Sequence, residues 1–284
     1  MNLVAFTVHD KHGKNVNGLE ATDFQVQEDG KPRRILIFDT PGRVGQMSIG
    51  ILIDRSKSRR DVFPNAEIEP LVKFVGLIVD EDRAAFAAAF NDRMMVVANY
   101  STHSSKLEGG IRSLESVEPI GGTALYDAIK QATGILFSQR GYRLLVIVGQ
   151  GDDNDSRTNA RDAIREAIKA GVAVYFVELE PGASYEEDRR AEDFVAKITQ
   201  NTGGEMLRVR NATGMETAFS SIEEDLSHLY LIGYLIGYSP SQSLKAGQFH
   251  KLEIRTKKKG LRVTAPTEFY APASAQRGNS PMSQ

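Results

Sequence analysis

The chain has 284 residues, of which 41% are hydrophobic, and 35 basic residues nearly balance 37 acidic residues to give a formal net charge of −2. This length allows one large or two modest domains with an extensive core. The charge balance gives no indication of nonspecific nucleic-acid binding, the absence of cysteine excludes disulfides and thiolate metal sites, and no apolar run approaches the roughly 18 residues that span a membrane.

The N-terminal residues 3–38 have the pattern of β-strands. Apolar side chains alternate with smaller or polar ones from Val4 to Val8 and again over Phe24–Glu28. Asp29-Gly30 is a strong signal for a two-residue hairpin turn. We expect Arg34–Phe38 to form the return strand of that hairpin.

Residues 46–228 alternate strand and helix signals, which favours a mostly parallel sheet covered by helices on both faces. Apolar runs predict five parallel strands and an antiparallel edge strand, in the order Ser48–Ile53, Ala84–Phe90, Met94–Ala98 (the edge), Leu144–Val148, Val172–Val177 and Glu205–Val209. Helical periodicity predicts six helices near Val62–Ile78, Ser105–Leu114, Ala124–Phe137, Asn159–Ala170, Arg189–Gln200 and Ala212–Ser227.

Strand signals return after Leu229, at Tyr230–Tyr238, His250–Thr256 and Leu261–Thr264. The simplest arrangement joins the N- and C-terminal strands into one β-sandwich, with the doubly wound α/β unit inserted between them. The predicted division is therefore a β-sandwich domain from residues 1–40 plus 229–272, an α/β domain over 41–228, and a disordered tail over 273–284, which is rich in Ser, Ala, Gly and Pro.

The candidate site begins directly after the first predicted parallel strand, with Asp54, Ser56 and Ser58. Open α/β sheets bind ligands at the carboxyl ends of their strands, and one carboxylate with two hydroxyls can supply oxygen ligands to a hard cation. A second loop that enters a helix contributes another hydroxyl, Thr123. The simpler alternative is ordinary turn and helix-cap chemistry, for which Asp, Ser and Thr are favoured in any protein.

At these residues the chain resembles the von Willebrand factor type A domain, in the bacterial branch where that domain is embedded in a small β-rich domain. Asp54, Ser56 and Ser58 match the first part of the family's metal-ion-dependent adhesion site, and Thr123 in Gly-Gly-Thr-Ala-Leu-Tyr-Asp-Ala matches the second. The flanking segments that share the resemblance are Asp23–Pro32, Tyr234–Pro240 and Phe269–Pro272.

The resemblance implies a von Willebrand factor A-like α/β fold and a non-catalytic adhesion module. In this family a cation, for which Mg²⁺ is the first candidate and Mn²⁺ or Ca²⁺ are alternatives, bridges the site to an acidic group of a protein partner. It would be held by Asp54, Ser56, Ser58 and Thr123. Relatives in this branch usually carry an export signal, so we expect a secreted or periplasmic protein if the chain is a mature form, and a cytoplasmic one if it is full length.

The third part of the family site departs from the pattern. An Asp normally follows the fourth strand, but Gln150 occupies that position. Because a divalent cation gains most from anionic oxygen, an amide in place of a carboxylate weakens the site. Asp152 and Asp153 are candidates for a partial replacement or for the rim of the site, although the sequence does not show where their side chains point.

Four cationic residues crowd the same turn, namely Arg55, Lys57, Arg59 and Arg60. They oppose a bound cation, and one hypothesis is that this rim binds an acidic group of the partner directly. The simpler alternative is a solvated charged turn.

Two further functional classes stay open at this point. One is a hydrolase or phosphoryl-transfer enzyme that uses Asp54, and the other is a structural assembly domain with a dead site. Enzyme signals are otherwise weak: Gly149-x-Gly151 lacks the third glycine of a dinucleotide loop, because Asn154 occupies that position. The five histidines show no metal-ligand spacing. The sequence therefore favours a protein-binding module that is not an enzyme.

Overall fold

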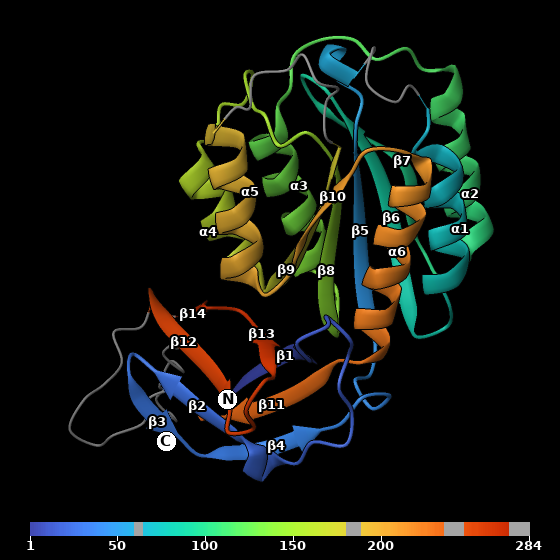
Figure 1. Cartoon of the computed structure of the whole chain (residues 1–284). Coiled ribbons are helices and arrows are strands. Elements are labelled where there is room, and N and C mark those ends of the chain that lie inside the picture. The colour runs from blue at the N-terminus through green and yellow to red at the C-terminus, as the bar shows by residue number, and fades with distance from the viewer. Residues whose placement is uncertain (60–64, 180–188, 236–246, 273–284) are drawn as a thin grey trace, which may run out of the picture.

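The structure, a computed structural model, describes residues 1–59, 65–179, 189–235 and 247–272. It has two parts, an α/β domain and a β-sandwich built from the two ends of the chain, which lie one above the other in Figure 1. The predicted fold class is confirmed. The division of the chain at residues 40 and 228 stays a prediction, and the tail over 273–284 lies outside the described residues.

The central sheet of the α/β domain has the strand order β10-β9-β8-β5-β6-β7. Its strands are β5 (Met47–Asp54), β6 (Arg83–Phe90), β7 (Met94–Ser101), β8 (Tyr142–Gly149), β9 (Val172–Leu179) and β10 (Met206–Val209). Neighbouring strands are parallel except for the edge strand β7, which pairs antiparallel with β6, as predicted. All eight residues of β5 are buried because helices cover both faces of the sheet.

Three helices cover each face of this sheet (Figure 1). One face carries α1 (Ile68–Ile78), α2 (Ser104–Arg112) and α6 (Ala212–Ser227), and the other carries α3 (Leu125–Phe137), α4 (Ala160–Ala170) and α5 (Arg189–Thr202). The described part of the first predicted helix begins at Ile68, six residues later than expected, and residues 60–64 lie outside the described ranges. Among the described residues, no helix combines the length and the apolar character needed to cross a membrane.

The β-sandwich consists of two four-stranded sheets, with the orders β13-β1-β11-β4 and β14-β12-β2-β3. Its strands are β1 (Asn2–His9), β2 (Phe24–Glu28), β3 (Lys31–Arg33), β4 (Ile35–Asp39), β11 (Tyr230–Tyr234), β12 (Gln248–Thr256), β13 (Arg262–Thr264) and β14 (Glu268–Ala271). Aromatic rings fill the space between the sheets: Phe6 stacks on Tyr230 at 5.6 Å and meets Phe24 edge-on at 5.1 Å. The predicted strand after Tyr230 is described as far as Tyr234, and residues 236–246 lie outside the described ranges.

The predicted hairpin at Asp29-Gly30 forms, but its return strand is different from the expected one. Both turn residues have positive φ, 49° and 75°, as a two-residue turn of this hand requires. The return strand is β3, because so short a turn pairs the residues directly next to it, Glu28 with Lys31. The expected return strand Arg34–Phe38 was wrong: the chain crosses to the other sheet, where β4 pairs with β11.

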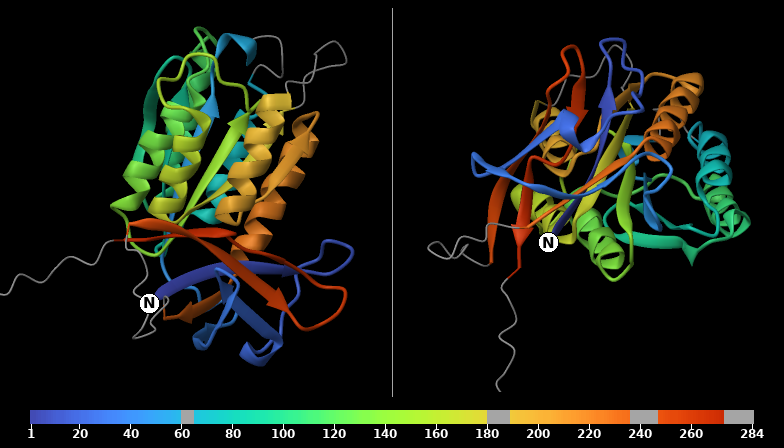
Figure 2. Two further views of the ribbon diagram at one scale, coloured as in Figure 1. Left: turned by 90° about the vertical axis from the view of Figure 1, so that its left-hand side faces the viewer. Right: turned by 90° about the horizontal axis from the view of Figure 1, so that it is seen from below.

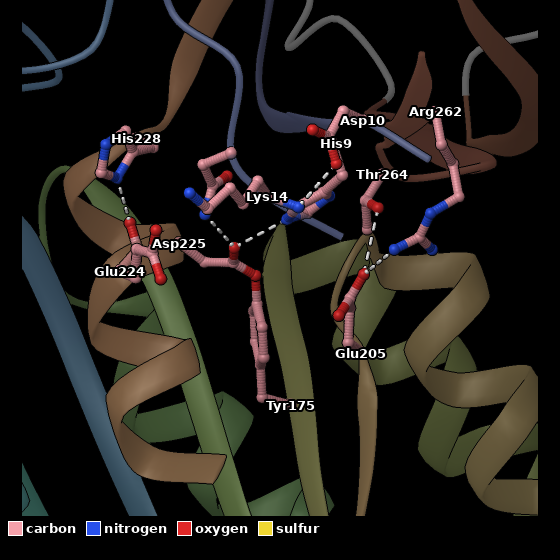
Figure 3. A network of polar contacts seen from close by, with 11 residues as sticks. His9, Asp10, Lys14, Tyr175, Glu205, Glu224, Asp225, His228, Arg262 and Thr264 are labelled. Carbon is pink, nitrogen blue, oxygen red and sulfur yellow. Dashed lines mark hydrogen bonds and ion pairs between the residues drawn. The ribbon is translucent and has the colours of Figure 1, made fainter. Parts of the chain in front are cut away.

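A buried carboxylate joins the two parts of the molecule (Figure 3). Asp225, close to the end of α6, is 2% exposed. Its Oδ1 atom lies 3.0 Å from Nε2 of His9 and accepts a hydrogen bond of 3.0 Å from the side chain of Asn15, both in the β-sandwich part. Its Oδ2 atom accepts a hydrogen bond of 3.1 Å from the hydroxyl of Tyr175 in β9. The α/β domain and the sandwich therefore share one polar network.

Candidate functional site

Two of the predicted site loops meet at the carboxyl edge of the central sheet. The loop after β5 donates from the backbone N–H of Lys57 to the carbonyl of Gly121, at 3.1 Å. In return, the carbonyl of Arg55 accepts from the N–H of Ile120, also at 3.1 Å. These reciprocal bonds fix the first loop against the second, which leads into α3.

The third loop follows β8, the neighbour of β5 in the sheet, with Val148 opposite Ile53. Asn154 binds Thr123 twice: its N–H donates to the Thr123 carbonyl at 2.9 Å, and its side-chain oxygen accepts from the Thr123 N–H at 2.8 Å. The sequence indicated Asn154 only as the residue that breaks a dinucleotide motif. Its hydrogen bonds between the two loops are long-range contacts, which no local sequence pattern shows.

Asp54, Ser56 and Ser58 form a compact set of oxygen atoms. The Asp54 carboxylate is 1% exposed and accepts a hydrogen bond of 2.9 Å from the backbone N–H of Ser56. The hydroxyls of Ser56, which is fully buried, and of Ser58, which is exposed, lie 2.9 Å apart. Asp54 fits against Gly149, where an added Cβ would lie 3.2 Å from the carboxylate, so a larger residue at that position would crowd it.

The two aspartates of the third loop point to different partners. Asp152 accepts a hydrogen bond of 3.4 Å from the hydroxyl of Thr123, which is itself buried. Asp153 instead accepts from the N–H of Tyr126 at 2.9 Å and from the hydroxyl of Ser156 at 2.6 Å, at the first turn of α3. Asp152 therefore belongs to the group of oxygens around Thr123, whereas Asp153 stabilises the start of the helix.

Gln150 is 7% exposed, and among the described residues neither its amide nitrogen nor its amide oxygen has a hydrogen-bond partner. A buried polar group without a partner costs about 1–3 kcal/mol. Buried polar groups without a partner are rare in folded proteins. Stability therefore does not explain why a glutamine occupies this position.

The prediction that Arg55 belongs to an exposed cationic rim was wrong. Its side chain is 4% exposed and is held from inside the domain: Nη1 lies 3.3 Å from a carboxylate oxygen of Glu67 and 3.0 Å from the Asn65 side chain. Nη2 donates to the carbonyls of Leu114, at 3.0 Å, and Val117. The guanidinium thus anchors the first loop to the segment after α2.

The other three predicted rim cations have different positions. Lys57 is exposed and begins a short 3₁₀ helix (Lys57–Arg59), of which Arg59 is the last residue. Arg60 lies outside the described residues. Lys57 is therefore the member of the predicted rim whose side chain the structure places at the surface.

A profile of the von Willebrand factor type A domain family matches residues 48–221 of the 284. The chain belongs to this family. Members of the von Willebrand factor type A family are generally protein-interaction or adhesion modules and are typically non-catalytic. No curated protein sequence matches the chain closely.

Solved structures show the same fold at low sequence identity. A von Willebrand factor type A protein from Catenulispora acidiphila has a TM-score of 0.53 and 13% identity, with coverage of 89% of this chain and 74% of that one. The PilB minor pilin from Streptococcus sanguinis has a TM-score of 0.52 and 14% identity, with 66% of this chain covered. Proximal thread matrix protein 1 from the mussel byssus has a TM-score of 0.51 and 16% identity, with coverage of 66% and 47%. The match spans 63% of the pilin, which is less than two thirds of its length.

The donor set in this von Willebrand factor type A domain fits a hard divalent cation by its chemistry. Asp54 supplies a carboxylate, and Ser56, Ser58 and Thr123 supply hydroxyls, all of which are oxygen ligands of the kind that Mg²⁺ and Ca²⁺ accept. Gln150 adds no negative charge. Among these residues, Asp54 is the one that carries a negative charge.

Proposed function

We propose that the protein is a non-catalytic binding module that recognises an acidic group of a protein partner at the carboxyl edge of its central sheet. The observation that supports this most is the hydrogen bonding between the three site loops, which brings Asp54, Ser56 and Thr123 to one edge of a rigid sheet. Functional groups on loops that a rigid scaffold positions are the usual basis of a binding site.

In this proposal a divalent cation is held by Asp54, Ser56, Ser58 and Thr123, and Mg²⁺ is the first candidate because it accepts few protein ligands and keeps several waters. Asp152, which accepts from the Thr123 hydroxyl, orients that hydroxyl. The cation supplies the positive charge to which a partner Asp or Glu binds. The neutral amide of Gln150 makes the site a weakened one.

Lys57 supplies a second positive charge at the same rim. Its side chain is exposed, and its backbone N–H is fixed to Gly121. Because Arg55 is buried in a pair with Glu67, we assign the direct attraction of an acidic partner to Lys57 rather than to the arginine beside it. Lys57→Glu should therefore weaken binding of an acidic partner and leave the fold intact, by a modest factor because surface charges interact by about 1 kcal/mol or less. Unchanged partner affinity in this variant would count against the assignment.

Calorimetric titration with Mg²⁺, Mn²⁺ and Ca²⁺ tests the site. The unmodified chain should bind weakly, Gln150→Asp should tighten binding by at least about tenfold, equal to about 1.4 kcal/mol, and Asp54→Ala should abolish it. Equal heats for the unmodified chain and the Asp54→Ala variant would show that the cation binds elsewhere. No binding by the Gln150→Asp variant would show that these oxygens do not form a cation site.

The alternative of an enzyme that uses Asp54 is tested separately. A screen for phosphatase and nucleotide-hydrolysis activity, with Asp54→Asn as the control, should show no turnover that depends on Asp54. Turnover that disappears in the Asp54→Asn variant would replace the binding proposal with a catalytic one.

A further inference from the structure

Two turns lie next to one another at one end of the β-sandwich. The first, residues 10–14, follows β1, and the second, residues 257–261, leads into β13. Because β1 and β13 are antiparallel neighbours with His9 opposite Arg262, both turns leave the paired strands at the same end. Both views of Figure 2 show them side by side, one in blue and one in red. We call residues 10–14 and 257–262 the basic tip.

The basic tip carries six basic side chains and one acidic side chain. The basic ones, all of which are exposed, are Lys11, Lys14, Lys257, Lys258, Lys259 and Arg262. Lys258 pairs with Asp23 at 3.0 Å, and Arg262 pairs with Glu205 at 2.8 Å. In the part of the chain that the structure describes, the other four lysines form no ion pair with a carboxylate. The tip therefore keeps an excess of positive charge on a chain whose net charge is −2.

The acidic side chains closest along the first segment are used by the backbone. Oδ1 of Asp10 accepts a hydrogen bond of 2.7 Å from the N–H of His12 and one of 3.0 Å from the N–H of Lys14. Glu20 accepts from the backbone of the short 3₁₀ helix that it caps, Ala21–Asp23. Neither carboxylate forms an ion pair with a described residue, so the unpaired lysines of the tip are not neutralised by direct contact.

Both turns are held in place by hydrogen bonds. The N–H of Asp10 donates to the carbonyl of Lys14 at 2.9 Å and closes the first turn. In the second turn, the N–H of Lys257 donates to the carbonyl of Asp23 at 2.8 Å, and its ammonium donates to the carbonyl of Thr22 at 2.7 Å. Because the backbone is already ordered, little conformational entropy is lost when this surface binds a ligand.

The basic tip offers charge and little else. It contains no Phe, Tyr or Trp on which nucleic-acid bases could stack. Leu261 is its one large apolar side chain and packs against the core of the sandwich, so the tip lacks the apolar centre that protein–protein interfaces have. A surface of this kind fits a ligand that is itself a continuous negative surface, and an anionic lipid bilayer is such a ligand.

We propose that the basic tip docks the protein on an anionic lipid bilayer, by electrostatic attraction and without insertion. The contributions of basic residues near such a surface add up and fall off within a Debye length, so docking is reversible and weakens as salt is added. The sandwich lies at the amino edge of the central sheet, where β5 begins at Met47, and the candidate adhesion site lies at the carboxyl edge (Figure 1). A bilayer and an adhesion partner can therefore be bound at the same time.

Sedimentation of the full chain with lipid vesicles tests this proposal. The buffer contains EDTA, so that no cation at the candidate adhesion site bridges the chain to lipid. Vesicles of equal parts phosphatidylglycerol and phosphatidylcholine should sediment the chain at low salt, whereas vesicles of phosphatidylcholine alone should not. Lys11→Glu with Lys259→Glu, one change in each turn, should weaken binding to the anionic vesicles by at least about tenfold.

The matched control is Lys106→Glu with Lys130→Glu, which changes the net charge equally at two exposed positions on α2 and α3. This variant should sediment as the unmodified chain does. Equal weakening in both double variants would overturn the proposal, as would sedimentation of the unmodified chain that does not depend on phosphatidylglycerol.

Two competition experiments distinguish a bilayer from other anions. Glycerol phosphate at constant ionic strength should not displace the chain from anionic vesicles, because one phosphate cannot contact both turns as a surface does. Displacement would reveal a site for a single phosphate and would overturn the proposal. Tighter binding of an oligonucleotide than of anionic vesicles would also overturn it and would assign the basic tip to nucleic acid.

Discussion

Replacement of Asp225 by alanine should destabilise the protein strongly, because this one carboxylate joins its two parts. Three side chains contact it, at 3.0 Å from His9, 3.0 Å from Asn15 and 3.1 Å from Tyr175. A hydrogen bond to a charged group is worth about 1.5–3 kcal/mol, and removal of one partner from a buried charged pair costs about 3–5 kcal/mol. Since contributions within one network are not additive, we expect Asp225→Ala to lower the free energy of unfolding by about 3–5 kcal/mol.

Urea unfolding followed by far-ultraviolet circular dichroism measures this change. Tyr175→Phe removes one hydrogen bond to this carboxylate and should lower the free energy of unfolding by about 1.5–3 kcal/mol. Glu224→Ala, at an exposed position next to Asp225 on the same helix, is the control and should change the stability by less than about 0.5 kcal/mol. A loss below about 1 kcal/mol for Asp225→Ala, where about 3–5 is expected for a buried pair, would refute the view that this network couples the two parts.

Three further outcomes are expected. Gly141→Ala should lower the melting temperature and reduce the free energy of unfolding by about 3 kcal/mol or more. The reason is that Gly141 has a φ of +78° and an added Cβ would lie 1.8 Å from the carbonyl oxygen of Gln46. An unchanged melting curve would contradict this. Arg55→Ala should lower the free energy of unfolding, measured by chemical denaturation, by about 3–5 kcal/mol, since it removes the guanidinium that pairs with the buried Glu67 carboxylate. A loss no larger than that for an exposed arginine would show that this pair contributes little to stability. The hydrogen bond to Asp225 raises the pKa of His9 above its ordinary value of 6.5. The stability from this pair is therefore complete below about pH 6.5 and lost as the pH rises through the raised value, so the unfolding free energy removed by His9→Ala should be larger at low pH than at high pH.

The central sheet could be predicted from the sequence because its signals are local. The runs Ser48–Ile53 and Leu144–Val148 lie inside β5 and β8, and their continuous apolar character follows from burial on both faces. The destination of β4 could not be predicted in this way. The local turn at Asp29-Gly30 fixes only the short strand next to it, whereas β4 pairs with β11, almost two hundred residues later in the chain.

The candidate site shows the same limit at the level of single side chains. The sequence indicates which loops carry oxygen ligands, but Arg55 had the same local signal as the exposed Lys57 two residues later. Its burial depends on Glu67 and on the carbonyls of the segment after α2. The directions of Asp152 and Asp153 are likewise set by neighbours on another loop and helix.

Paramagnetic relaxation by Mn²⁺ tests the central claim most directly, because it reports where a cation binds. In spectra of the isotope-labelled chain, substoichiometric Mn²⁺ should broaden the amide signals of Ser56, Ser58, Thr123 and Gly149 first, and more strongly at lower metal concentration in the Gln150→Asp variant. Excess Mg²⁺ should reverse the broadening. Broadening centred on any other surface, or none in either protein, would contradict the assignment of this edge of the sheet as a cation-dependent site for an acidic partner.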